Sequence, residues 1–212
     1  MQEVALRDGL QNEQMMLTVE QKIELLRNFA SCGLARIEVS SFVNPKVVPQ
    51  MADAEEVWER MDRVDGVLYS ALVLDENGLN RAMRSKVPHV GIWVSASETH
   101  SRKNSNKTID QSLKHALGLI EKAKHAGMDV RAGVMCAFGC AYEGDVPEDM
   151  VARVVRSLKA AGPDEISLAD TAGMANPLQI DSTVRIINDA ADGLPLSLHL
   201  HNTRGLGMVN VY

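Results

Sequence analysis

Short apolar segments rich in β-branched residues alternate along this chain with longer stretches in which apolar residues recur every three or four positions. The short segments have the pattern of strands and the longer ones that of helices. Seven strands are predicted: Glu3–Leu6, Ala35–Ser40, Val67–Leu72, Val90–Ser95, Val130–Cys136, Glu165–Leu168 and Leu196–His201. They recur about every 30 residues, which is typical of βα units and predicts an α/β fold with a parallel sheet.

The predicted helices carry end signals in the sequence. Thr18 with Gln21, and Thr108 with Gln111, have the spacing of a capping box, in which each side chain bonds the backbone N–H of the other residue. Glycines that favour a left-handed C-terminal cap follow several helices: Gly33, Gly127, Gly162 and Gly193. No linker rich in Gly, Ser or Pro interrupts the chain, so we expect residues 1–212 to form a single domain.

Hydroxyl-bearing and ionisable side chains stand at the carboxyl ends of the predicted strands. They are Arg7, Asp8, Glu38, Ser40, Ser95, Asp170, Thr171, His199 and His201. In a (β/α)8 barrel these strand ends meet at one mouth, whereas an open sheet spreads them along an edge. We therefore predict a (β/α)8 TIM barrel. Because about seven of its eight strands are visible, we expect the barrel to be truncated and the domain to be incomplete at its C-terminus.

Composition and charge exclude several classes of partner. Aromatic residues make up 4% of the chain and the formal net charge is −6, which favours neither nucleic acid nor an anionic membrane. No apolar run has the length of a membrane span, and the first residues do not form a signal peptide. The few cysteines, Cys32, Cys136 and Cys140, predict a reducing cytoplasm, and we expect the last two to be core thiols.

The most informative local pattern is His199-Leu200-His201. Residues i and i+2 of a strand point to the same face, roughly 6.6 Å apart along it. Both imidazoles can therefore approach one metal ion. The alternative is a pair of buried, hydrogen-bonded histidines without a metal, and the pattern by itself leaves both interpretations open.

Charged residues near other strand ends are further candidates. Asp8 can offer an oxygen ligand to a divalent cation, and Arg7 beside it can hold a carboxylate or a developing oxyanion, although a surface ion pair is the alternative. Glu38 interrupts an apolar strand, so its carboxylate must be paired, protonated or close to a metal. Asp170 is a similar candidate, with capping of the helix that follows at Asn176 as the alternative.

The segment between Ser95 and Lys107 is polar and locally basic in an otherwise acidic chain. Its Arg102, Lys103 and Asn104 suit a phosphate-bearing substrate, and a solvated loop is the alternative. The sequence contains neither a Walker A loop nor a G-x-G-x-x-G motif, so the usual fingerprints of nucleotide binding are absent.

Several strings along nearly the whole chain resemble the 3-hydroxy-3-methylglutaryl-CoA lyase family, a group of metal-dependent TIM-barrel enzymes that act on carbon–carbon bonds. The strings are Arg7–Glu13 (RDGLQNE), Ile37–Lys46 (IEVSSFVNPK), Val48–Met51 (VPQM), Gly139–Gly144 (GCAYEG), Ile166–Gly173 (ISLADTAG) and His199–His201 (HLH). The first two are specific to the lyase branch. The aspartate and H-x-H elements alone would also fit isopropylmalate and homocitrate synthases.

This resemblance implies a retro-Claisen cleavage of 3-hydroxy-3-methylglutaryl-CoA to acetyl-CoA and acetoacetate, with Mg²⁺ or Mn²⁺ as cofactor and coenzyme A as part of the substrate. It assigns the metal to Asp8, His199 and His201, and stabilisation of the enolate to Arg7. It assigns the acyl pocket and its proton network to Gln11, Glu38, Asp170 and Thr171. It assigns contact with coenzyme A to Lys103 and Asn104. His199 and Asp170 are both candidates for the base.

The resemblance also brings expectations about context and some open alternatives. It implies leucine degradation and ketone-body metabolism in the cytoplasm, with a small-molecule acyl-CoA as partner and a homodimer as one open assembly state. The family's fourth metal ligand, an asparagine, and its cysteine-bearing Gly-Gly-Cys loop are expected beyond Tyr212. Asn202, Arg204 and Ala141 depart from the family's pattern, which leaves the acyl preference open. A lyase for a related 3-hydroxyacyl-CoA and an inactive fragment that binds metal or CoA are the alternatives.

Overall fold

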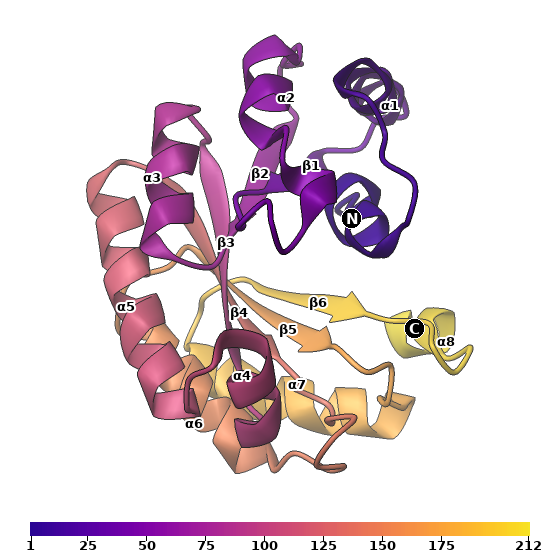
Figure 1. Cartoon of the computed structure of the whole chain (residues 1–212). Coiled ribbons are helices and arrows are strands. Elements are labelled where there is room, and N and C mark those ends of the chain that lie inside the picture. Colours follow the sequence, from indigo (N-terminus) through magenta and orange to yellow (C-terminus); the bar gives the residue numbers. More distant parts are fainter. The chain divides into compact units, whose positions relative to one another are not determined.

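A computed structural model describes residues 1–212, and the chain divides into two compact units. Unit 1 comprises Met1–Gly91 and His125–Asp129, and unit 2 comprises Ile92–Lys124 and Val130–Tyr212. Each unit combines parallel strands with helices (Figure 1). None of the helices is both long enough and apolar enough to cross a membrane.

Unit 1 contains two complete strands, which pair in parallel, and the first residues of a third. Its elements are η1 (Ala5–Gly9), η2 (Leu10–Asn12), α1 (Val19–Ser31), β1 (Arg36–Ser41), η3 (Pro49–Met51), α2 (Ala54–Arg60), β2 (Leu68–Val73), α3 (Glu76–Arg84) and the start of β3 (His89–Ser95). The strands follow the order β1-β2-β3, and Glu38 of β1 lies opposite Ser70 of β2. The register shifts between Glu38 and Ser40, where the ladder is irregular.

The segment predicted as the first strand, Glu3–Leu6, is not a strand. Only Glu3 forms a parallel bridge, to Ile37, and a single π-helical turn follows at Ala5–Gly9. The Glu3 carboxylate accepts the N–H groups of Val4 and Ala5 at 2.8 and 2.7 Å. Because these amides are bound locally, they are not offered to a neighbouring strand, and the sheet has six strands rather than seven.

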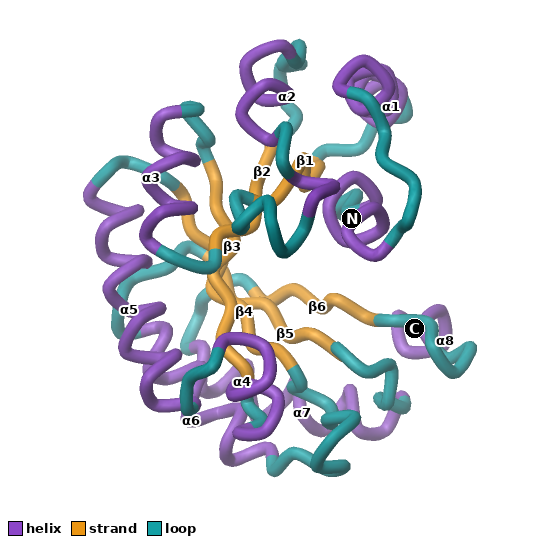
Figure 2. The backbone as a smooth tube through the Cα atoms, in the orientation of Figure 1, coloured by secondary structure: helices purple, strands orange, loops and turns teal.

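Unit 2 contains the rest of β3 and three further parallel strands in the order β3-β4-β5-β6 (orange in Figure 2). Its other elements are α4 (Glu98–Ser105), α5 (Ile109–His125), β4 (Asp129–Met135), α6 (Glu148–Lys159), β5 (Glu165–Asp170), α7 (Pro177–Ala191), β6 (Leu196–Leu200) and α8 (Gly207–Val211). Every residue of β5 is buried. The regular register places Gly133, Ser167 and Ser197 at one level across three strands.

The helix end signals read from the sequence are confirmed. Thr18 Oγ1 accepts the N–H of Gln21, and Thr108 Oγ1 accepts that of Gln111, with both reciprocal side-chain bonds present. The four predicted capping glycines have positive φ angles: Gly33 (76°), Gly127 (76°), Gly162 (77°) and Gly193 (89°). Local signals thus determine where these helices begin and end.

Candidate active site

In unit 1, four of the predicted site residues form one hydrogen-bonded group, which we call the arginine cluster: Arg7, Asp8, Gln11 and Glu38. Arg7 Nε donates to Glu38 Oε1, and Arg7 Nη1 donates to Asp8 Oδ1 at 2.7 Å. Gln11 Nε2 donates to the same Asp8 oxygen at 3.1 Å. Glu38 is 1% exposed and Arg7 is 7% exposed, so this ion pair is buried. The expectation that Glu38 needs a partner is met by Arg7.

Two residues beside the arginine cluster were not predicted from the sequence as part of the site. Gln2 Nε2 donates to Glu38 Oε2 and to Ser70 Oγ, each at 3.3 Å. Ser70 is buried and lies opposite Glu38 in the ladder of β1 and β2. The pairing of these two strands is the signal that would have identified Ser70. For Gln2, the interpretation of Glu3–Leu6 as a regular strand concealed the contact.

In unit 2, the two predicted histidines converge and form what we call the histidine pair. His199 lies on β6 and His201 directly follows this strand, and both are half-buried. Their Nε2 atoms are 2.9 Å apart. The other ring nitrogen of His201, Nδ1, is 3.0 Å from the carbonyl oxygen of Thr171. Since a carbonyl only accepts hydrogen bonds, Nδ1 of His201 donates to it, and Nε2 is the ring nitrogen directed at His199.

The distance between the Nε2 atoms fits two ligands of one divalent ion. Adjacent donors on an octahedral ion, each about 2.1 Å from it at a right angle, are about 3 Å apart. The observed 2.9 Å is close to that separation. The carbonyl behind His201 is the kind of outer partner that orients a metal-binding imidazole. The donor set therefore suits a divalent cation, which is one of the two interpretations that the H-x-H pattern left open.

Asp170 and Thr171 build the turn that follows β5. Asp170 is fully buried; its Oδ1 accepts the N–H of Met174 at 2.8 Å and its Oδ2 that of Ala175 at 3.1 Å. Thr171 Oγ1 accepts the N–H of Cys136 at 2.8 Å. The alternative that Asp170 caps α7 is wrong, because Asn176 occupies that position. Asp170 instead shapes the turn from which the Thr171 carbonyl reaches His201.

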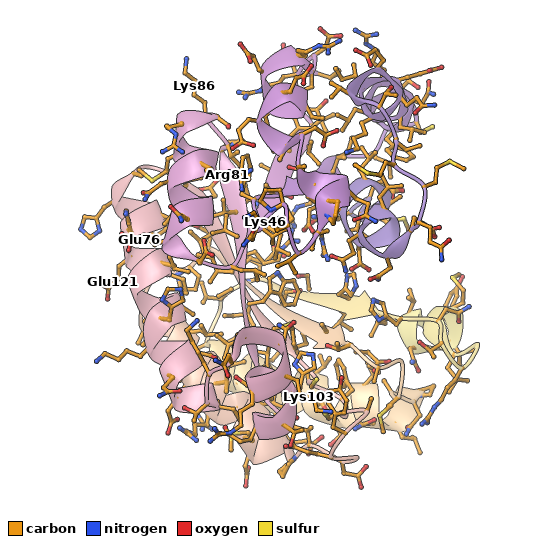
Figure 3. All side chains as sticks on the ribbon, viewed as in Figure 1. Lys46, Glu76, Arg81, Lys86, Lys103 and Glu121 are labelled. Carbon is orange, nitrogen blue, oxygen red and sulfur yellow. The ribbon has the colours of Figure 1, made fainter.

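Lys103 and Asn104 are exposed on α4, a helix in the segment for which a solvated loop was the alternative. The helix begins at Ser97, whose Oγ accepts the N–H of His100. Lys103, labelled in Figure 3, places its Nζ 3.9 Å from the ring centroid of Tyr142. The basic charge predicted here therefore projects from a helix and is held over an aromatic ring.

Cys136 and Cys140 are buried, as expected of core thiols. Burial raises the pKa of Cys136 to about 12. Burial also raises the pKa of Cys140, but hydrogen bonds from the Ser97 hydroxyl and from backbone amides outweigh it, so the net pKa is lowered. Ser97 Oγ donates to Cys140 Sγ at 3.0 Å. The two thiols therefore differ in their ease of ionisation.

Comparison with known proteins supports the family to which these residues point. The HMGL-like family model matches residues 1–212. A lyase of Pseudomonas aeruginosa described as acting on 3-hydroxy-3-isohexenylglutaryl-CoA and hydroxymethylglutaryl-CoA is 39% identical over 99% of this chain and 70% of its own length. The chain belongs to the HMG-CoA lyase family. This is a family of carbon–carbon lyases.

Solved structures of HMG-CoA lyases have the same fold. The Bacillus subtilis HMG-CoA lyase superposes with a TM-score of 0.96 at 39% identity, covering 99% of this chain and 70% of that one. An Acinetobacter baumannii HMG-CoA lyase, solved with coenzyme A and 3-methylmalate, matches with a TM-score of 0.94 at 36% identity, covering 99% and 68%. The predicted α/β TIM-barrel class is confirmed, with six parallel strands of that barrel in this chain.

Proposed function

We propose that this chain carries the chemistry of an HMG-CoA lyase and splits 3-hydroxy-3-methylglutaryl-CoA into acetyl-CoA and acetoacetate. The family supports this activity. The observation that carries it at the level of the site is the convergence of the His199 and His201 Nε2 atoms at 2.9 Å. Two imidazoles whose Nε2 atoms are directed at one point provide a place for the divalent cation on which the cleavage depends.

We assign the cation, Mg²⁺ or Mn²⁺, to Asp8, His199 and His201. This assignment follows the family resemblance. Arg7 and Gln11 hold the Oδ1 atom of Asp8, and the Nε2 atoms of the histidine pair are 2.9 Å apart. When bound, the cation lowers the pKa of a coordinated hydroxyl and orients it. Carboxylate oxygen and neutral imidazole are ligands that such ions accept.

Residues of the protein transfer the protons and stabilise the negative charge that develops in the reaction. A base takes the proton of the tertiary hydroxyl, and that carbon becomes the ketone of acetoacetate as the carbon–carbon bond breaks. The bonding electrons move into the thioester, giving an enolate that is protonated on carbon to acetyl-CoA. We assign the base to His199 or Asp170. Asp170 already commits both oxygens to backbone N–H groups, and the lone pair of a neutral His199 is assigned to the cation, so both residues stay candidates.

Arg7 is the residue that we expect to hold the negative charge of the enolate. Its guanidinium has five donors in a rigid fork. Glu38 binds Nε and Asp8 binds Nη1, so the fork is held in a fixed orientation before substrate arrives. A donor organised in advance stabilises developing charge without the energy of rearrangement. Glu38 is thus the residue that orients the Arg7 guanidinium.

The remaining residues are assigned to recognition of the substrate. Gln11 and Thr171 contact the acyl group in this proposal, and Lys103 with Asn104 meets coenzyme A from α4. The coenzyme A bound to the A. baumannii lyase supports an acyl-CoA as the ligand class. We place the protein in the cytoplasm, in leucine degradation and ketone-body formation, without nucleic-acid or membrane partners, and leave a homodimer as one assembly to be tested.

A coupled assay for acetoacetate tests the proposal. The chain is incubated with 3-hydroxy-3-methylglutaryl-CoA and Mg²⁺ or Mn²⁺, beside Arg7→Met and the matched control Arg27→Met, which alters an exposed arginine. We expect acetoacetate from the parent and from the control, and a loss of on the order of 100-fold or more in Arg7→Met.

The other outcomes distinguish the alternatives. Acetoacetate absent from folded, metal-loaded protein contradicts the assignment of this substrate. Cleavage of 3-hydroxy-3-isohexenylglutaryl-CoA in that case identifies a lyase for a related acyl-CoA, since one relative carries that name. Binding of both esters without cleavage identifies a protein that only binds CoA esters.

A further inference from the structure

Trp93 lies on β3, within unit 2, and contacts His199 of the histidine pair. Its ring centroid is 6.4 Å from that of His199, and the two planes meet at 72°, an edge-to-face arrangement. The ring rests on the backbone of β4 at Gly133. A Cβ atom at Gly133 would come within 2.1 Å of Trp93 Cε3, so only glycine leaves room for the indole in this position.

The strands beside this contact carry small side chains at the same level. Gly133 of β4 is in register with Ser167 of β5, and Ser167 with Ser197 of β6. Ala169 is in register with His199 itself. In a parallel ladder, residues in register project to the same face. The rings that pack edge-to-face against His199 are those of His201, at 4.8 Å between centroids, and of Trp93, at 6.4 Å.

The indole N–H of Trp93 makes no hydrogen bond. Nε1 is buried and has no partner among residues 1–212. In contrast, Nε1 of Trp58, in unit 1, donates to Ser40 Oγ at 2.9 Å. A buried donor without an acceptor gives no advantage to tryptophan over phenylalanine. What Trp93 contributes here is the shape and position of its ring.

The two histidines are thus oriented by different means. His201 is held through its Nδ1 by the Thr171 carbonyl. His199 has an aromatic edge-to-face contact with Trp93, which restricts rotation of the imidazole about χ2. Both arrangements keep the Nε2 atoms directed at one point.

We propose that Trp93 is a positioning residue that holds the imidazole plane of His199, with Gly133 as the recess that lets it do so. This inference rests on the proposed function, because it assigns Trp93 to the cation site that the histidine pair would form. Groups that orient a metal-binding histidine typically change metal affinity by about 10–100-fold when they are removed. We expect an effect of that size from loss of the Trp93 ring.

A Co²⁺ titration of the purified chain tests this without relying on catalysis. Affinity is read from the visible absorption of bound Co²⁺, and proximity from quenching of tryptophan emission. Trp93→Leu removes the ring and should weaken Co²⁺ binding by about tenfold or more. Trp93→Phe keeps a ring without the unbonded N–H and should bind within about threefold of the parent. Gly133→Ala displaces the indole and should weaken binding in the same direction as Trp93→Leu.

The two tryptophans provide an internal control. The chain has two tryptophans, so Trp93→Phe leaves Trp58 as its single indole fluorophore. Co²⁺ should quench the emission of Trp58→Phe, in which Trp93 is the single indole. Far-UV circular dichroism and thermal unfolding verify that each variant is folded.

The proposal is overturned if folded Trp93→Leu binds Co²⁺ as tightly as the parent, if Trp93→Phe loses as much affinity as Trp93→Leu, or if the parent binds no Co²⁺. Failure of the proposed lyase activity has a different signature. A protein that shows the expected Co²⁺ pattern without cleaving the CoA ester retains the positioning role and loses the substrate assignment. A protein that cleaves the ester while Trp93→Leu keeps full affinity retains the function and loses the positioning role.

Discussion

The arginine cluster of unit 1 and the histidine pair of unit 2 are held in place by different forces. Arg7 and Glu38 are opposite charges, 7% and 1% exposed, and each is the other's partner. His199 and His201 are half-buried and are oriented by a backbone carbonyl and an aromatic ring. The arginine cluster depends on a buried ion pair, whereas the histidine pair depends on a contact with a backbone carbonyl and on ring packing.

This difference predicts how stability and function are coupled in each region. Removing one partner of a buried ion pair leaves an uncompensated charge in a medium that solvates it poorly. Removing a half-buried imidazole leaves neither a charge nor a large cavity. We therefore expect damage to the arginine cluster to lower the free energy of unfolding strongly, and damage to the histidine pair to weaken cation binding in a protein of nearly unchanged stability.

The largest effect on stability is expected for Glu38→Ala. This change leaves the buried Arg7 guanidinium without Glu38 and should lower the free energy of unfolding by about 3–5 kcal/mol. The matched control Glu56→Ala removes the exposed pair with Arg60 and should cost less than about 1 kcal/mol. Urea unfolding measures both. Equal losses in the two variants would remove the distinction between a buried and an exposed ion pair.

A smaller loss of stability is expected for Asp170→Ala in unit 2. This variant tests whether the buried carboxylate stabilises the fold through its charge or through its hydrogen bonds with backbone N–H groups. The variant leaves the N–H groups of Met174 and Ala175 without their acceptor and should cost about 1–3 kcal/mol in urea unfolding. Asp170→Asn keeps one acceptor oxygen and should cost less. If Asp170→Asn is stable yet loses all turnover, Asp170 rather than His199 is the base.

His201→Ala should leave stability within about 1 kcal/mol of the parent, because the side chain is half-buried. Loss of one ligand should nonetheless weaken Co²⁺ binding by on the order of 100-fold or more, beyond the effect of removing an outer partner. Co²⁺ titration and urea unfolding of the same sample separate the two quantities. His125→Ala, at an exposed histidine, is the control. A His201→Ala protein that binds Co²⁺ normally rules out the histidine pair as the cation site.

The smallest effect is expected for the pH dependence of the free energy of unfolding, to which His100 contributes. Burial lowers the pKa of His100 from 6.5, against the attraction of Glu143, while its Nδ1 lies 3.1 Å from Ser95 Oγ. As pH falls below about 6.5, the unfolded chain takes up this proton before the folded chain does. The free energy of unfolding should therefore decrease from that pH down to the folded pKa. His100→Gln should flatten this slope, and urea unfolding of the parent and the variant between about pH 4 and pH 8 measures it.

Patterns within a few residues were predicted correctly from the sequence. The capping boxes at Thr18 and Thr108 form as their spacing requires. The two-residue period of a strand brings His199 and His201 to the same side. The signals for βα units also identified the fold class. These features depend on backbone geometry that neighbouring residues determine by themselves.

Contacts between strands and turns could not be derived in this way. The bridge at Glu3 replaces a predicted strand because its own carboxylate binds the next amides. The role of Asp170 depends on how the turn closes over its two oxygens. Gln2 meets Glu38 and Ser70 only through the placement of the chain beside β1 and β2. Each of these needed the positions of atoms that the local pattern does not specify.

The sequence by itself therefore determined the positions of the six strands, the ends of several helices, and the residue types that carry chemistry. The tertiary structure decided which of these residues are held together: Arg7 by Glu38, His201 by the Thr171 carbonyl, and His199 by a tryptophan seated on Gly133. The physical reason is the distance along the chain over which each kind of interaction acts. Periodicity and capping act over a few residues along the chain, whereas burial, register and ring packing join residues that are dozens of positions apart.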